Sequence, residues 1–377
     1  MGIATPYSSP PAIARGVVIA LRLFDVAYAI DLPKAETLWA AQPRPASRGR
    51  LSFIPPKAMA FGVPPVELTL DPVALVLEGV AVQANVVVRV YDFGAVSFAL
   101  HVAVQDLPWD GFVRRVNAMD LLVGAGAETD VWSKLLAKVL SLLGPALIRP
   151  QPSALEEDYL IGLVHTFDTP LTAAQVWERC DLVPLLSGET RPLSEGARQD
   201  LLRQRFSYYV DDLAVITWDR AFIYEPRGDS DVIDVLEVAN AQLLELRYYD
   251  ELLDDELPRM YELVGRARLA TATLAARKFA NLARRLYTLV AEVTELTERV
   301  DNALQVTEDV YLARVYTAAL DLYRVPAVNA AVERKLAIIR DTYAALYDES
   351  SSRRAELMEF LILLLIAVEI VLALVRW

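Results

Sequence analysis

The N-terminal part of the chain alternates apolar runs with segments of helical spacing. The run Gly16–Asp25 is almost continuously apolar and predicts a buried strand. The runs Val80–Val90 and Ala95–Val104 are rich in β-formers and flank residues 91–94, where Asp92 and Gly94 supply turn chemistry. These two runs therefore predict a β-hairpin.

Helices and shorter strands alternate over the next hundred or so residues. Trp109–Val123 and Asp130–Leu147 have the spacing of amphipathic helices. One strand, two helices and three short β-prone runs are predicted after them, at Tyr159–Thr166, Ala173–Cys180, Arg198–Arg205, Phe206–Val210, Ala214–Trp218 and Ala221–Tyr224. We predict an α+β body over residues 14–228, with two halves at 14–150 and 151–228 as one arrangement. The polar, Pro-rich residues 1–13 predict a disordered tail.

From residue 231 to residue 356 the pattern is helical, and Pro258 is expected to break or kink the path. The clearest a/d seam of a coiled coil runs through Phe279, Leu282, Leu286, Leu289, Val293, Leu296, Val300 and Ala303. A second seam follows Pro326, at Val328, Val332, Leu336, Ile339, Tyr343 and Leu346. Two seams separated by a break predict either an antiparallel hairpin, which is the simpler option, or a stalk that self-associates.

The last segment, Phe360–Val375, is apolar except for Glu369. These 16 residues rise about 24 Å as a helix, but residues 357–377 would cross a hydrocarbon core of about 30 Å with their ends at the interfaces. We predict that residues 357–377 form a single-pass, C-terminal transmembrane helix, so that the protein is tail-anchored and its body is cytoplasmic. The alternative is a terminal helix buried in an oligomer core. Four anchor residues are predicted: Phe360, Leu364, Glu369 and Trp377.

Charge is distributed unevenly, and this limits the partners. The net charge of −13 lies in residues 1–260, which hold 22 Lys and Arg against 35 Asp and Glu, whereas the remaining residues hold 15 of each sign. An acidic body argues against binding nucleic acid. Only a local patch in the C-terminal part could bind it. Between residues 265 and 291 there are six basic residues and no acid, and Arg266, Arg277 and Arg284 share one helix face.

That basic face predicts contact with RNA phosphates or anionic lipid, or else forms the solvated flank of the coiled coil. Elsewhere candidate chemistry is sparse. Cys180 is the only cysteine, which excludes an intrachain disulfide and a thiolate zinc cluster. His101 and His165 lie in apolar runs and are interpreted as core residues. No Gly-rich phosphate loop is present.

A run of acids could hold a divalent cation, but it lacks the alternating ligands and the glycine of an EF-hand loop, so we interpret it as a solvated turn. Its members are Asp250, Glu251, Asp254, Asp255 and Glu256. We therefore predict no catalytic residue, no cofactor, no metal, no small-molecule substrate and no enzymatic activity.

Residues 353–360, followed by the aliphatic run with Glu369, resemble the C-terminal signature of the required-for-meiotic-nuclear-division family. Glu359 and Glu369 match the two acids of that signature, and Phe360 replaces its tryptophan. Residues 91–96 and 157–159 are similar to two short motifs that lie upstream of this signature in the family. The resemblance implies a divergent bacterial member of a conserved family of unknown activity, with one C-terminal membrane anchor. Mitochondrial relatives form large inner-membrane homo-oligomers that support translation of organelle-encoded proteins.

Three functions follow from these patterns. The first is a non-enzymatic, membrane-tethered structural or assembly protein that forms homo-oligomers through its helical region. The second is a membrane-associated factor that contacts the ribosome or RNA through the basic helix 266–285, as implied by the mitochondrial relatives. A metal channel of the CorA type is distant, because a single spanning segment and the absence of a Gly-Met-Asn filter argue against it. RNA co-purification would separate the first two.

Overall fold

The computed structural model describes residues 10–41, 64–150, 155–228, 231–268 and 309–375, together with single helical positions between 281 and 294. The chain divides into two compact units. Unit 1 contains residues 1–245 and 299–326, and unit 2 contains residues 246–298 and 327–377. The predicted seam at 279–303 lies almost entirely outside the described residues.

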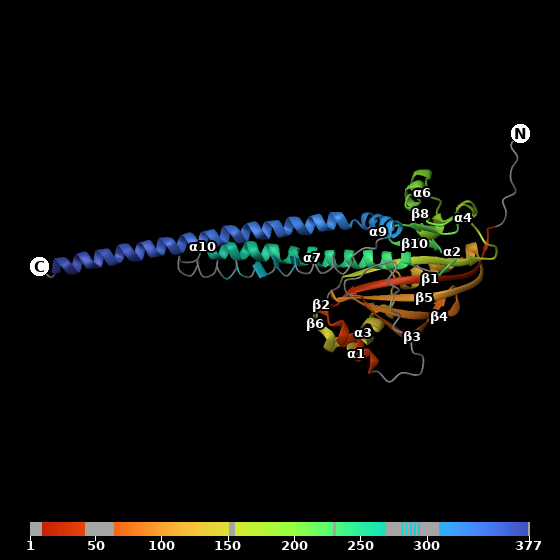
Figure 1. The fold of residues 1–377 in the computed structure, drawn as a ribbon, viewed down its shortest axis with the longest axis horizontal. Helices are drawn as coiled ribbons and strands as arrows, with labels where there is room; N and C mark the ends of the chain where they lie inside the picture. The colour runs from red at the N-terminus through yellow and green to blue at the C-terminus, as the bar shows by residue number, and fades with distance from the viewer. Residues whose placement is uncertain are drawn as a thin grey trace. The chain divides into compact units, whose positions relative to one another are not determined.

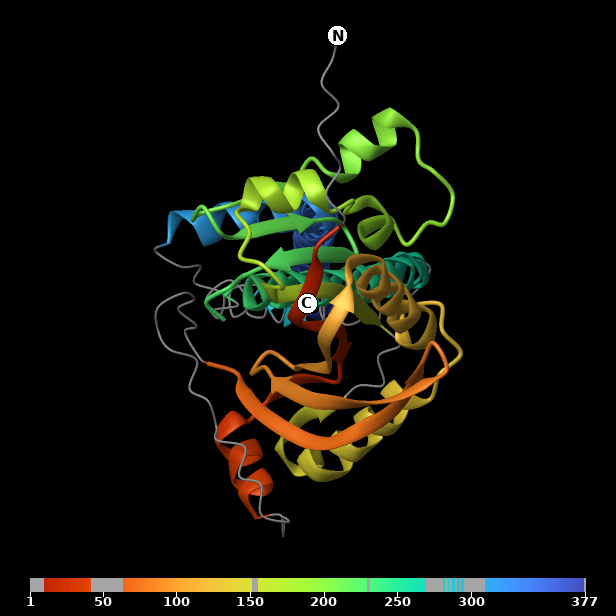
Figure 2. The same cartoon turned by 90° about the vertical axis from the view of Figure 1, so that its right-hand side faces the viewer.

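Unit 1 is built on one eight-stranded sheet, whose strands lie in the order β3-β4-β5-β1-β7-β10-β9-β8 (Figure 1). Neighbouring strands are antiparallel except for β10, which is parallel to β7. Figure 2 shows the strong curvature of the long strands, drawn in orange. The strands are β1 (Ala12–Asp25), β3 (Val66–Leu77), β4 (Val80–Val90), β5 (Ala95–Pro108), β7 (Glu156–Phe167), β8 (Arg205–Phe206), β9 (Leu213–Ile216) and β10 (Arg220–Tyr224).

The predicted hairpin of β4 and β5 is confirmed, and its turn has a clear geometric requirement. Tyr91 N–H donates to the Ala95 carbonyl at 2.9 Å, and Gly94 has a φ of 104°. A Cβ at Gly94 would lie 1.7 Å from the Ala27 carbonyl oxygen, so only glycine fits there. Ala27 belongs to β2 (Ala27–Ile30), which pairs with β6 (Leu147–Pro150) in a separate two-stranded sheet.

Helices cover both faces of the large sheet. One face packs on a continuous apolar core with Phe98, Phe112 and Trp132, to which most of the short helices contribute. These helices are α1 (Leu32–Ala40), α2 (Trp109–Val123), α3 (Val131–Leu143), α4 (Ala173–Arg179), α5 (Val183–Ser187) and α6 (Glu195–Leu201). The opposite face contacts the first half of α7 (Asp231–Arg268) through Tyr91. The residue that follows α9 (Val310–Leu322), Tyr323, contacts Tyr159 of β7.

Unit 2 contains the second half of α7 and the helix α10 (Val325–Val375) from residue 327 onward. α7 runs through Pro258 instead of ending there. Lys335 of α10 pairs with Asp250 and Asp254 of α7, at 2.7 and 2.6 Å. Of the second predicted seam, Val332, Leu336 and Ile339 are buried.

The predicted C-terminal transmembrane helix is wrong. None of the helices that the structure describes is both long and apolar enough to cross a membrane. α10 has 51 residues, but its apolar stretch Phe360–Val375 rises only about 24 Å, less than a hydrocarbon core of about 30 Å. The predicted tail anchor is therefore wrong, and so is the predicted single-pass membrane localisation that depended on it. Leu364 is 51% exposed, whereas Trp377 and the side chains of Phe360 and Glu369 lie outside the described residues.

Candidate functional site

A groove opens in unit 1 between the strand β8, which ends the order of the sheet, and the helix α9. α9 begins at an N-cap: the side chain of Asp309 accepts hydrogen bonds from Tyr311 N–H at 2.7 Å and Leu312 N–H at 3.3 Å. Such a cap satisfies amide groups that have no partner within the helix. β8 is held by β9, since Ile216 N–H donates to the Gln204 carbonyl at 3.1 Å. Both walls of the groove are therefore positioned by ordered backbone.

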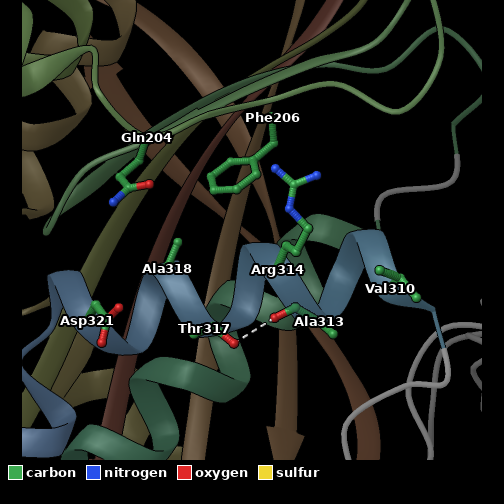
Figure 3. A pocket seen from close by; sticks show the side chains of 8 residues that line it. All are labelled: Gln204, Phe206, Val310, Ala313, Arg314, Thr317, Ala318 and Asp321. Atoms are coloured by element: carbon green, nitrogen blue, oxygen red, sulfur yellow. Dashed lines mark hydrogen bonds between the residues drawn. The ribbon is translucent and has the colours of Figure 1, made fainter.

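The groove has a volume of about 520 Å³ and a mixed lining. In Figure 3 Arg314 and Ala318 project from α9 toward the wall that carries Gln204 and Phe206, and the Phe206 ring lies between Gln204 and Arg314. Thr317 donates its hydroxyl hydrogen to the Ala313 carbonyl at 2.9 Å and so stays within its own helix. The lining consists of Gln204, Phe206, Val310, Ala313, Arg314, Thr317, Ala318 and Asp321. Ligand-binding sites also combine an apolar lining with a few polar groups.

Aromatic side chains lie beside the groove. Tyr208 and Tyr209 are 61% and 47% exposed, and the Tyr208 ring lies 5.4 Å from the ring of Tyr311 in α9. The backbone amides of both residues donate to Asp212 Oδ1, at 2.7 and 3.0 Å, which fixes the loop after β8. Burial raises the pKa of the Tyr311 hydroxyl well above its usual value, so it stays protonated. The loop and the start of α9 thus form one ordered rim.

A buried charge network fixes α7 to the sheet of unit 1. The Arg89 guanidinium lies 2.6 Å from Glu237, 2.8 Å from Asp234 and 3.3 Å from Glu67. The Tyr91 hydroxyl donates to Glu237 at 3.0 Å. Burial opposes the charge on Arg89, but the carboxylates of Glu237 and Asp234 outweigh it, and the pKa of Arg89 rises well above its ordinary value. We assign this network a structural role, because every group in it is paired.

A second network fixes the C-terminal end of α2. The Arg220 guanidinium donates to Asp120 at 2.6 Å, to Asn117 at 2.7 Å and to the Leu185 carbonyl at 3.0 Å. Arg22 donates to Glu156 at 2.7 Å and to the carbonyl of Val123, the last residue of α2, at 3.0 Å. Cations near a helix C-terminus complement its dipole. This network, too, is structural.

Most of the sequence-predicted site residues lie outside the residues that the structure describes. Of the oligomer seam, Val293 is buried, and Leu282, Leu286, Leu289, Leu296 and Val300 lie outside the described residues. Of the basic face, Arg284 is exposed on a helix, whereas Arg277 and the side chain of Arg266 lie outside them. The contact of this face with RNA, the ribosome or lipid stays a prediction.

The candidate chemical groups have ordinary structural surroundings. Burial lowers the pKa of His101 to about 4, with the charge of Arg89 adding to the effect, so His101 is neutral. His165 Nδ1 lies 3.3 Å from the Glu225 carbonyl oxygen. Cys180 is buried, and burial raises the pKa of its thiol to about 12. Within the described ranges, no group of His, Cys, Asp and Glu side chains has the arrangement to hold a metal.

Sequence reasoning missed the groove altogether. Its walls come from residues 204–206 and 310–321, about a hundred positions apart, and no local pattern connects them. One signal was present: Asp309 stands before a segment of helical spacing and marks the start of α9. The pairing of Arg89 with acids on α7 has no sequence signature, because its members are more than 140 positions apart.

Comparison with known proteins gives one family match and one relative. Residues 15–231 match the family described as "Uncharacterized protein MJ0711, N-terminal domain". The chain is 26% identical over 196 residues to "Uncharacterized protein MJ0711" of Methanocaldococcus jannaschii. The aligned residues make up 52% of this chain and 59% of that protein. No solved structure matches. The family match covers the sheet of unit 1 as far as the first residue of α7. Neither match confirms the resemblance to the meiotic-division family.

Proposed function

The chain belongs to the family of the MJ0711 N-terminal domain, and from this premise we propose that it is a non-enzymatic structural or assembly protein that forms homo-oligomers through its helical region. The similarity to the relative spans only 59% of the relative's length. The family match ends at residue 231, where α7 begins. The proposal therefore depends on the helices of this chain itself. The finer resemblance to the meiotic-division family, whose mitochondrial members form homo-oligomers, is consistent with it.

The observation that carries the proposal is the surface of α10 near its C-terminal end. Its large apolar side chains are between 47% and 64% exposed, which a single chain in water does not sustain over so long a run. They are Met358, Leu361, Ile362, Leu363, Leu364, Leu365, Ile366, Val368, Ile370, Val371 and Leu372. Because these positions lie all around the helix, one neighbour cannot cover them. A helix that is apolar on every side is normally buried among others.

A second copy of the same chain is the partner that this surface fits. Leu361, Leu365, Val368 and Leu372 follow one another at steps of four, three and four, which is the spacing of a coiled-coil seam. Each copy brings an identical seam, so several copies can bury one another in a symmetric bundle. Adjacent apolar positions on the flanks of the seam favour more than two helices.

The oligomeric state of the full chain tests this proposal. We expect analytical ultracentrifugation in detergent-free buffer to give a mass that is a multiple of 41.9 kDa. The double variant Leu361→Asp with Leu365→Asp should have a lower mass, because it would bury unpaired charge in the bundle. Leu121→Asp is the matched control: Leu121 is 81% exposed in α2 of unit 1, so its variant should keep the wild-type mass.

Circular dichroism of each variant must match the wild type, so that a change in mass is not a change in folding. A wild-type chain that sediments as a monomer at micromolar concentration would contradict the proposal. So would a double variant that keeps the wild-type mass.

A further inference from the structure

Two opposite charges face the groove between β8 and α9, and neither has an ion-pair partner among the residues that the structure describes. Arg314 and Asp321 are both exposed and stand seven positions apart on α9. Seven residues make about two helical turns, so both side chains leave from one face, with their Cα atoms about 10.5 Å apart along the axis. The groove thus has a cationic end and an anionic end.

Asp321 does not stabilise α9 at the position where it stands. α9 has no basic residue in its last turn, where cations would complement the dipole, and Asp321 stands there instead. A carboxylate near a helix C-terminus is unfavourable. Helix stability therefore does not explain why an acid occupies this position, whereas a cationic group bound in the groove would.

Between the two charges the lining suits a backbone with small side chains. Phe206, Ala313 and Ala318 supply an apolar floor, and Val310 stands at the cationic end (Figure 3). The Gln204 side chain reaches the groove from the opposite wall. Its amide can donate to a carbonyl and accept from an N–H, as a peptide bond requires.

The dimensions agree with a short extended chain. An extended peptide advances about 3.3 Å per residue, so three residues span about 10 Å, similar to the separation of Arg314 and Asp321 along the helix. The volume of about 520 Å³ accommodates a molecule of this size. A free carboxylate matches the fork of a guanidinium, and a free ammonium matches a carboxylate.

We propose that this groove binds a short peptide in its zwitterionic, extended form. Arg314 binds the terminal carboxylate, Asp321 binds the terminal ammonium group, and Gln204 hydrogen-bonds a peptide bond between them. This binding site is independent of the self-association proposed above, because it depends on different residues in a different unit.

Isothermal titration calorimetry with trialanine tests the proposal on the full chain. We expect saturable binding of one peptide per chain. N-acetyl-trialanine and trialanine amide each lack one terminal charge, and each should bind at least about tenfold more weakly, the loss expected for one charge-assisted hydrogen bond.

Substitutions of the two charged groove residues should weaken peptide binding as much as the removal of a terminal charge from the peptide. Arg314→Gln and Asp321→Asn should each weaken trialanine binding about tenfold or more. Asp321→Asn should leave the melting temperature unchanged or slightly higher, since it removes an acid from the last turn of α9. Arg334→Gln and Asp341→Asn serve as controls, because these exposed residues have the same seven-residue spacing on α10 and do not line the groove.

Binding that is insensitive to the acetyl and amide caps would overturn the proposal, as would the absence of any binding by the folded wild-type chain. Equal loss in the groove variants and the α10 controls would show that only non-specific charge attraction is present, and this result would also overturn it.

Discussion

Unit 1 and the C-terminal end of α10 in unit 2 both depart from the usual placement of polar and apolar side chains, but in opposite directions. Unit 1 buries charged side chains: Arg22, Arg220 and Glu237 are between 2% and 6% exposed. The end of α10 instead exposes large apolar side chains such as Leu365, which is 64% exposed. Both are departures from the ordinary distribution, in which charges face water and large aliphatic groups do not.

The difference shows where the partners of each region are. Each buried arginine of unit 1 finds its carboxylates and carbonyls within the chain, at 2.6–3.3 Å. The described apolar side chains near the C-terminal end of α10 are exposed, and we propose that other copies of the chain cover them. A buried ion network adds little net stability compared with an apolar one, but breaking it is costly. The buried arginines of unit 1 are thus paired within that unit, and the following predictions test this contrast.

The largest effect is expected from breaking the network under α7. Arg89→Met removes one cation and leaves Glu67, Asp234 and Glu237 around an apolar side chain. We expect the free energy of unfolding at neutral pH to fall by about 3–5 kcal/mol, the usual cost of an uncompensated buried charge. Chemical denaturation measured by fluorescence checks this.

The same variant has a diagnostic pH dependence. Burial raises the pKa of Asp234, and this effect grows once Arg89 is absent. A folded-state pKa above the unfolded value makes the native state bind more protons, so the variant's deficit should shrink as the pH falls toward 4. A deficit that is the same at pH 4.5 and pH 7.5 would show that lost packing, not charge, causes it.

A smaller effect is expected at Asp25, which ends β1. It is 3% exposed, its Oδ2 has no hydrogen-bond partner in the described structure, and burial raises its pKa from 3.8 to about 7. The unfolded chain loses this proton near pH 4 and the folded chain near pH 7. Stability should therefore fall as the pH rises between these values, by about 1.4 kcal/mol per unit at most.

Asp25→Asn should remove that dependence of stability on pH. The free energy of unfolding of the variant should therefore rise relative to the wild type between pH 4 and pH 7, and the difference should be constant above pH 7. Other groups, such as His101, titrate in both proteins and cancel in the difference. Denaturant titrations at half-unit steps of pH measure it. Parallel curves for the two proteins would mean that Asp25 has polar partners in solution.

The smallest effect on folding is expected at the exposed end of α10. Leu365→Ser changes a side chain that is 64% exposed, and surface substitutions usually alter the free energy of unfolding by less than about 0.5 kcal/mol. At protein concentrations low enough for the monomer, we expect no measurable change. At high concentration, the melting temperature of the wild type should rise above that of the variant, because association stabilises the folded chain. If the wild type and the variant have equal melting temperatures at every concentration, other copies of the chain do not cover the exposed end of α10.

Local patterns predicted several elements well, and their failures have identifiable causes. The helix Trp109–Val123 agrees with α2 to the residue, because amphipathic spacing is a property of the segment alone. Strand β3 was missed because Asp71 and Pro72 interrupt its apolar pattern; the pairing with β4 shifts between Leu70 and Val73. Proline is tolerated there because β3 is an edge strand. Pro258 lies within α7 rather than at its end.

The membrane prediction failed for a different reason. It extended the apolar run Phe360–Val375 at both ends, through residues that include Glu359 and Arg376, to reach the length of a membrane. The structure places that run at the end of a helix of 51 residues that carries charged side chains over most of its length. The hydrophobicity of a segment shows that its side chains favour removal from water. It does not show whether lipid, the same chain or another chain removes them from water.

The sequence by itself determined the helical and strand segments with clear periodicity, the hairpin of β4 and β5 and the acidic character of the first 260 residues. Each of these depends on neighbours along the chain or on composition. Only the tertiary structure decided the order of the strands, the pairing of Arg89 with Asp234 and Glu237, and the groove between β8 and α9. The reason is physical: the decisive contacts join residues far apart in the chain, from 60 positions for Arg220 and Leu160 to 148 for Arg89 and Glu237, and their free energy exists only after the intervening chain has folded.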